Sequence, residues 1–241
     1  MVKGVKSEEV IKIIQMISLE KRKQVKYISV DMANSMEKIA NICFPDACVV
    51  TDRFHVAKLI SEAVQDIRIK HRWKAIDKEN QMIENAKKEA IKYIPSKYEN
   101  GDTEKQLLAR SRYLLFKTNK KWTDSQKIRA EILFRQYPEI HKAYKLSMMF
   151  RNIYETAKDK RHAKILLNNW YDKIKSSKLK SFNSAANSVK NHEQTILNYF
   201  PNKVTNALAE NFNSKIKAFR ATFRGVRDLS FFLFRVANIF A

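Results

Sequence analysis

Three acidic residues stand beside apolar segments, where they could take part in metal-dependent chemistry. Asp31 follows the apolar run VKYISV, Asp52 follows ACVVT, and Glu210 lies in the segment NALAENFNSKIKAF. Metal-assisted cleavage of a phosphodiester needs hard oxygen ligands, normally several carboxylates from separate elements. The metal ions activate a water or a sugar hydroxyl, so no side chain has to become a covalent nucleophile. These residues therefore predict an acidic metal site that cuts phosphodiester bonds.

Each candidate residue also has a plainer structural explanation. An Asp at a strand end often caps the following helix, and a Glu on a polar helix face is usually solvated. His55 could simply cap or pack the helix that starts near Val56. Cys43 and Cys48 could begin a metal site with His55, but no second cysteine pair or histidine cluster completes one. We therefore expect both cysteines to be reduced and partly buried.

The segments around Asp31 and Asp52 are predicted to form a strand, a helix and a second strand. VKYISV and ACVVT are short, apolar and rich in β-branched residues, whereas residues 35–43 have a helical pattern. Short connections of this kind make the two strands parallel neighbours. Both carboxylates would then project from the carboxyl edge of the sheet, which is where open α/β sheets bind ligands.

The rest of the chain is predicted to be helical. From Val56 to Ile67 apolar residues form one helical stripe, and no convincing strand follows, so we expect five or six helices. Later, Leu208, Phe212, Ile216, Phe219 and Phe223 are spaced by four, four, three and four residues. They fall on one side of a helix, and packing of this side onto the sheet would leave Glu210 on the opposite face. The predicted fold class is α/β plus α, predominantly helical.

Composition indicates a polyanionic partner. The chain carries 47 Lys plus Arg against 25 Asp plus Glu, a net charge of +22 over 241 residues. Such a chain favours nucleic acid, although an AT-rich genome could raise the charge without creating a binding face. The start MVKGVKSEEV lacks the apolar stretch of a signal peptide, and Arg235 interrupts the apolar tail SFFLFRVANIF. We expect a cytoplasmic, nucleoid-associated protein with no membrane partner.

Several longer strings resemble one known family. VKYISVDMANSM, FPDACVVTDRFHVAKLISEAVQDIR and NALAENFNSKIKAFRATFRGVRDLSFFLFRV closely resemble the DDE domain of bacterial insertion-sequence transposases of the ISL3 group. KWTDSQK and FRQYPEIHKAYKLSMMFRNIYE resemble the helical middle of the same family. The resemblance covers nearly the whole chain. The motif DRFH followed by a distant E-x-x-N-x-K-I-K is fairly specific, whereas D-x-x-H alone is not.

The resemblance implies a fold, an activity and a set of site residues. It implies a ribonuclease-H-like sheet segment in residues 1–55, a helical insertion in 56–200 and a catalytic-helix segment in 201–241. The implied activity is cleavage and joining of transposon ends with Mg²⁺ or Mn²⁺. Asp31 would be the second family carboxylate and Glu210 the third, with Asp52 and His55 as a neighbouring motif that shapes the site. An assignment with Asp52 as the second carboxylate stays open.

The chain also departs from the family pattern. Family members carry a first aspartate on an early strand, after a zinc-binding and helix-turn-helix region. Before Asp31 this chain offers only Glu8, Glu9 and Glu20, all in or beside a predicted helix, and thirty residues cannot hold the expected earlier strands. We therefore expect an incomplete ribonuclease-H-like domain from a truncated transposase, inactive by itself and prone to self-association through an exposed strand edge.

The expected partners are the DNA of the transposon ends and either a second copy of this chain or an intact transposase. Trp73, Trp122 and Trp170 could stack on extruded bases, although an isolated Trp in a helical region is more often part of the core. A non-catalytic DNA-binding protein, or an inhibitor of intact transposase, is the alternative function. The residues predicted to contact DNA phosphates are Arg53, Arg68, Lys70, Arg72, Asn213, Lys215, Lys217, Arg220 and Arg224.

Overall fold

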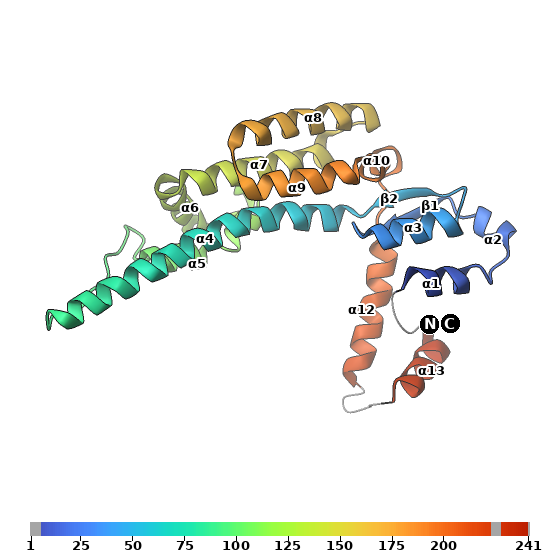
Figure 1. Ribbon diagram of the computed structural model, residues 1–241, viewed down its shortest axis with the longest axis horizontal. Coiled ribbons are helices and arrows are strands. Elements are labelled where there is room, and N and C mark those ends of the chain that lie inside the picture. Colours follow the sequence, from blue (N-terminus) through green and yellow to red (C-terminus); the bar gives the residue numbers. More distant parts are fainter. Residues whose placement is uncertain (1–5, 223–227, 241) are drawn as a thin grey trace. The chain divides into compact units, whose positions relative to one another are not determined.

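The two predicted strands are present and form a parallel pair. In the computed structural model, which describes residues 6–222 and 228–240, β1 (Tyr27–Val30) lies beside β2 (Cys48–Thr51) (Figure 1). Tyr27 is opposite Cys48 and Val30 is opposite Thr51. The helix α3 (Asn34–Cys43) connects the strands, as the sequence pattern predicts.

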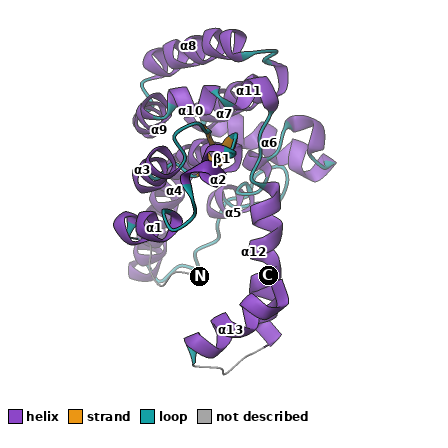
Figure 2. Cartoon of the chain, turned by 90° about the vertical axis from the view of Figure 1, so that its right-hand side faces the viewer, coloured by secondary structure: helices purple, strands orange, loops and turns teal. Residues whose placement is uncertain are grey.

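Helices make up most of the remaining described structure (Figure 2). Of the residues that the structure describes, 74% are helical and 4% are in strands, which confirms the prediction of a predominantly helical protein. Among the described residues, no helix is both long enough and apolar enough to cross a membrane.

The chain divides into two units, which are described separately below. The first, called the sheet unit, comprises residues 1–53 and 194–241, and the second, called the helical unit, comprises Phe54–Glu193. The sheet unit thus combines segments from the two ends of the sequence. Its helices other than α3 are α1 (Ser7–Ile14), α2 (Leu19–Lys23), most of α10 (Glu193–Leu197), α11 (Tyr199–Asn202), α12 (Ala207–Thr222) and α13 (Leu229–Phe240).

The first helical segment is shorter than its apolar pattern suggests. Val10, Ile14 and Ile17 recur at helical spacing in the sequence, but α1 ends at Ile14 and the chain turns before α2. Met16 is 84% exposed and Ile17 is 48% exposed, so no burial supports another helical turn there. Arg22 of α2 instead donates hydrogen bonds to the carbonyls of Ile17 at 2.9 Å and Cys43 at 2.5 Å. This cation stabilises the end of α3, where carbonyls lack helical partners.

Residues far along the chain complete the outer edge of β2. The amides of Cys48 and Asp52 donate to β1, so the carbonyl of Val49, between them, points away from β1. Asn198 donates a hydrogen bond of 2.8 Å to this carbonyl through Nδ2. The hydroxyl oxygens of Thr51 and Thr195 lie 2.7 Å apart in the interior. The return of the chain after α10 therefore satisfies polar groups that a third strand would otherwise pair.

The helical unit begins with the long helix α4 (Arg53–Lys88), of which all but the first residue belongs to this unit. Val56, Ile60, Val64 and Ile67 are buried on one face, in agreement with the predicted stripe. The helices that follow are α5 (Glu104–Arg110), η1 (Leu114–Phe116), η2 (Asn119–Lys121), α6 (Asp124–Gln136), α7 (Pro138–Thr156), α8 (Lys160–Ser177) and α9 (Lys180–Asn191).

Sequence signals mark several boundaries of these helices. Thr103 and Thr123 both form capping boxes with a glutamine three residues later, which satisfies two amides at each helix start. Pro138 occupies the first turn of α7, where its missing N–H costs nothing. Gly101 has φ +80° in the turn before α5, a conformation that suits glycine.

The core of the helical unit lies between α7, α8 and α9. Trp170, Phe150 and Phe182 are fully buried there. The ring centroids of Trp170 and Phe150 lie 4.7 Å apart, and the Trp170 indole donates a hydrogen bond of 3.0 Å to the carbonyl of Leu146. Trp170 is therefore a core residue, whereas Trp122 is half-buried and Trp73 is 61% exposed.

Candidate active site

Asp31 and Asp52 share the carboxyl edge of the parallel strand pair. Each is the first residue after its strand, and the pairing of Val30 with Thr51 brings the two strand ends level. The backbone amide of Asp52 donates a hydrogen bond of 2.8 Å to the carbonyl of Val30, which directly precedes Asp31. The parallel register of the two strands therefore places both acidic residues at one sheet edge.

The two carboxylates have different surroundings. Asp31 is half-buried, and its Oδ1 accepts a hydrogen bond of 3.0 Å from the amide of Ala33, at the start of α3. This contact is an Asx turn just before α3, whose N-cap is Ala33, so Asp31 has a local structural role although it does not itself cap the helix. Asp52 is only 5% exposed. Asp31 is thus the more accessible of the two acids.

Glu210 lies in the first turn of α12 and is exposed. Its backbone amide donates to the carbonyl of Asn206 at 2.9 Å, in the hydrogen-bond pattern of the helix. The aromatic side of α12 is only partly covered, because Phe212 is 43% exposed and Phe219 is half-buried against Phe232, with ring centroids 5.9 Å apart. Phe223 lies outside the described residues. Tight packing of this side on the sheet, which the spacing suggested, is not seen for Phe212.

Within the described residues, His55, Cys43 and Cys48 belong to no group of metal-ligating side chains. His55 is half-buried in the first turn of α4 and contacts Phe54 edge to face, with ring centroids 5.5 Å apart. It belongs to the helical unit, whereas Asp31 and Asp52 belong to the sheet unit. Cys43 is buried and Cys48 is half-buried, and both are free thiols. Burial raises the pKa of the Cys43 thiol, which keeps it in the unreactive protonated form.

The three carboxylates do not form an assembled metal site here. Their oxygen donors suit Mg²⁺ or Mn²⁺ chemically. However, nowhere in residues 6–222 and 228–240 do three or more His, Cys, Asp or Glu side chains come close enough to hold an ion. The arrangement therefore does not fit a complete metal site, and no metal-dependent step follows from it.

The basic residues predicted to contact DNA differ in accessibility. Lys70, Arg72, Asn213, Lys215, Lys217 and Arg220 are exposed, and Arg53 is half-buried. Arg224 lies outside the described residues. Arg68 differs from the others because it is only 4% exposed, and its guanidinium donates to the Leu108 carbonyl at 2.9 Å and to Gln65 Oε1 at 2.6 Å.

The buried guanidinium of Arg68 therefore links α4 to α5. Burial, followed by the nearby cations Arg72 and Arg112, lowers the pKa of Arg68 to about 10, so the side chain stays charged at neutral pH. Arg68 lies four residues after Val64, on the same side of α4, and this side is buried at both residues.

Comparison with protein families identifies the chain. A family model described as transposase, for the DDE transposases of the ISL3 group, matches residues 1–236. The chain belongs to the ISL3-group transposase family. No curated protein and no solved structure matches it. Membership in the ISL3-group family agrees with the resemblance carried by the DRFH motif and the helix around Glu210.

Sequence reasoning about this ISL3-group protein missed the residues that position the sheet edge from a distance. Thr195 and Asn198 contact β2 from the other end of the chain. Nothing in the spacing of either residue indicated this role, since Thr195 lies in the short helix α10 and Asn198 in the turn that follows it. Only their polarity among the buried neighbours Ile196 and Leu197 could have served as a signal.

Proposed function

We propose that this ISL3-group transposase chain acts in DNA transposition through a ribonuclease-H-like site at the carboxyl edge of β1 and β2. The observation that carries the proposal is the shared edge of Asp31 and Asp52, fixed by the parallel register of the strands. Ligands bind at this edge in open α/β sheets. The family match over residues 1–236 and the net charge of +22 support DNA as the substrate.

In this proposal Asp31 and Glu210 are the second and third family carboxylates. Asp31 is the stronger candidate at the sheet edge because it is more exposed than Asp52, which would shape the site together with His55. The resemblance assigns Mg²⁺ or Mn²⁺ to these acids. The exposed position of Glu210 leaves its carboxylate accessible to a ligand or partner.

We further propose that the chain by itself binds DNA without cutting it. Two observations support this part: the described residues contain no group of three metal ligands, and within them β1 pairs only with β2. The test is to incubate the purified chain with DNA that carries the transposon ends, in Mg²⁺ and separately in Mn²⁺. The expected result is salt-sensitive binding with no strand cleavage or joining.

A matched variant makes this test decisive. Strand transfer by the wild-type chain that Asp31→Ala abolishes would overturn the proposed inactivity while supporting the proposed site. The absence of any DNA binding at low salt would instead overturn the proposal that DNA is the partner. The alternative assignment, with Asp52 as the second carboxylate, predicts that Asp52→Asn removes activity from an assembled transposase and Asp31→Asn does not.

Inhibition of intact transposase is the second candidate function, and it is favoured by the edge of β1 that faces away from β2, where no other strand pairs within the described part of the chain. Because Lys26 and Val30 use their carbonyls to pair with β2, the backbone groups of Tyr27 and Ser29 face the other edge. Such an edge can pair with a strand of another chain. Mixing the chain with intact transposase should then reduce transposition in proportion to the amount added.

The edge can be blocked selectively. Ser29→Pro removes an N–H that faces away from β2, so it should relieve inhibition while the chain stays folded by circular dichroism. Ser18→Pro is a suitable control, because Ser18 precedes α2 with φ −55°, which proline accepts. Equal loss of inhibition in both variants would contradict a role for the strand edge.

A further inference from the structure

The cleft between α7 and α8 in the helical unit has an unusual lining. The two helices pack against each other, and the cleft between them has a volume of about 390 Å³. From α7, Lys142 and Lys145 are three residues apart, and from α8, Lys173 and Ser176 have the same spacing. Residues three apart lie on one side of a helix, so each helix turns a polar row toward the cleft. Its remaining lining residues are Leu146, Met149 and Ser177.

Positive charge in this cleft is not compensated. The lining includes three lysines and no acidic residue, and no ion pair involving Lys142, Lys145 or Lys173 occurs within the described residues. Close positive charges repel one another, so this arrangement favours an anion between them. Burial lowers the pKa of His141, and the nearby positive charge of Lys145 lowers it further.

The serines do not compete with the lysines for such an anion. The Ser176 hydroxyl donates to the carbonyl of Lys173 at 2.9 Å, and the Ser177 hydroxyl donates to that of Ile174 at 2.7 Å. Both hydroxyl protons are therefore used within α8. The three ammonium groups are left as the principal donors, above an apolar floor formed by Leu146, Met149 and the lysine stems.

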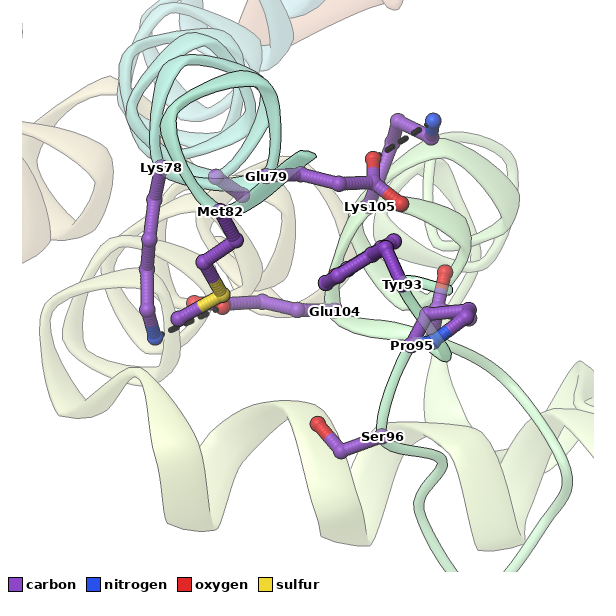
Figure 3. Close-up of a pocket in the computed structure, with 10 residues that line it drawn as sticks. Lys78, Glu79, Met82, Tyr93, Pro95, Ser96, Glu104 and Lys105 are labelled. Carbon is purple, nitrogen blue, oxygen red and sulfur yellow. Dashed lines mark hydrogen bonds and ion pairs between the residues drawn. The ribbon is translucent and has the colours of Figure 1, made fainter. Parts of the chain in front are cut away.

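Other hollows of the helical unit contain lysines whose charges are neutralised. In the pocket drawn in Figure 3, Lys78 pairs with Glu104 at 3.2 Å and Lys105 pairs with Glu79 at 2.6 Å. A larger hollow of about 560 Å³ contains two lysines, two acidic residues, Asn168 and Tyr171. There Lys164 pairs with Glu193, and Lys190 lies over the ring of Tyr171, 4.9 Å from its centroid.

We propose that the α7–α8 cleft, lined by Lys142, Lys145 and Lys173, binds the phosphodiester backbone of DNA. The inference rests on the proposed function, since it takes DNA as the partner of this transposase chain. Ammonium groups neutralise backbone phosphates without reading sequence, and the apolar floor suits the sugar between them. The cleft is therefore a positioning surface, and its lining includes none of the three candidate acidic residues.

The test is a measurement of DNA affinity against salt concentration. The full chain and the triple variant K142Q/K145Q/K173Q are titrated against a fluorescent duplex of arbitrary sequence between about 50 and 200 mM salt. Each phosphate contact contributes about 0.9 to the slope of log affinity against log salt. The triple variant should bind more weakly, and its slope should fall by about 2 to 3 in magnitude.

A control with the same charge change separates a local site from general charge. The variant K78Q/K105Q/K164Q also removes three lysines from the helical unit, but each of these is paired with a glutamate. It should change the slope by less than about 1. Circular dichroism spectra and thermal unfolding of both variants establish that they are folded.

The results of these titrations test separately whether the cleft is the DNA site and whether the chain binds DNA at all. An unchanged slope in K142Q/K145Q/K173Q, or an equal change in the control, would overturn the cleft as the DNA site while wild-type binding still stands. Failure of the wild-type chain to bind any duplex would overturn the proposed function itself. Displacement of the duplex from the cleft by a mononucleotide at equimolar concentration would also overturn the inference, because it indicates a small-anion site.

Discussion

The hydroxyl oxygens of Thr51 and Thr195 lie 2.7 Å apart in the interior of the sheet unit, although 144 residues separate them in the sequence. Thr51 is the last residue of β2, directly before Asp52, and Thr195 lies in α10. Both are nearly fully buried, at 1% and 7% exposed. This contact links the edge that carries Asp31 and Asp52 to the segment leading toward α12.

Removal of one hydroxyl of this pair should destabilise the protein more than removal of both. Thr51→Val or Thr195→Val keeps the shape but leaves the other hydroxyl without this partner, at a cost of about 1 to 2 kcal/mol. The double variant loses both polar groups and should recover much of this free energy. A double-mutant cycle of urea unfolding measures the coupling. Strictly additive losses would show that the two hydroxyls are not coupled.

Asp102 should be the carboxylate most important for the stability of the helical unit. It is fully buried, and it accepts hydrogen bonds from Arg110 and, at 2.8 Å, from Arg129 Nε. Removal of one member of a buried charge network leaves its partners uncompensated. Asp102→Ala should therefore lower the free energy of unfolding by about 3 kcal/mol. Asp124→Ala, at an exposed residue paired with Lys127, should change it little.

The contribution of Asp102 should also depend on pH. Burial pushes the pKa of this carboxyl up, but the hydrogen bonds from Arg129 and Arg110 outweigh burial and hold it below its usual value. The folded state therefore binds the proton more weakly than the unfolded chain. The stabilisation is fully present at pH values above the pKa of Asp in the unfolded chain, about 3.9. It disappears as the pH falls through the lower pKa that Asp102 has in the folded protein. Urea unfolding from pH 2 to 7 should show this loss in the wild type and not in Asp102→Asn.

Two substitutions of Asp31 should separate its structural role from its proposed role as a metal ligand. Asn can still accept the hydrogen bond from the Ala33 amide, so Asp31→Asn should keep the stability of the wild type. Asp31→Ala loses that acceptor and should cost about 1 kcal/mol. Both should abolish cleavage when the residue is changed in an active transposase. Retained cleavage in Asp31→Asn would show that its negative charge is not needed.

Arg68 and Arg72 are close in sequence but should respond differently to substitution. Arg68→Met leaves the Leu108 carbonyl without its donor and should destabilise the helical unit by about 2 kcal/mol, with no change in the salt dependence of DNA binding. Arg72→Met removes an exposed cation, so it should leave the unfolding midpoint nearly unchanged. A reduced salt slope in folded Arg68→Met would contradict the structural role of this guanidinium.

The strand, helix, strand unit could be predicted from sequence because its determinants are local. VKYISV and ACVVT are apolar and β-branched, and the short helix between them forces the strands to be parallel neighbours. The shared edge of Asp31 and Asp52 follows from that connectivity alone. The helical body was equally predictable, since the period of apolar residues from Val56 onward is a property of the chain itself.

Only the tertiary structure decided which residues of one type are buried and which are accessible. Trp170 is in the core and Trp73 is exposed, and Arg68 is buried whereas Arg72 is not. The residue type alone does not distinguish the members of each pair, because burial depends on contacts with helices far along the chain. Contacts between separate elements also bring Thr51 next to Thr195 and form the lysine cleft between α7 and α8. Local periodicity determines the face of a helix on which a residue lies, whereas long-range packing determines what covers that face.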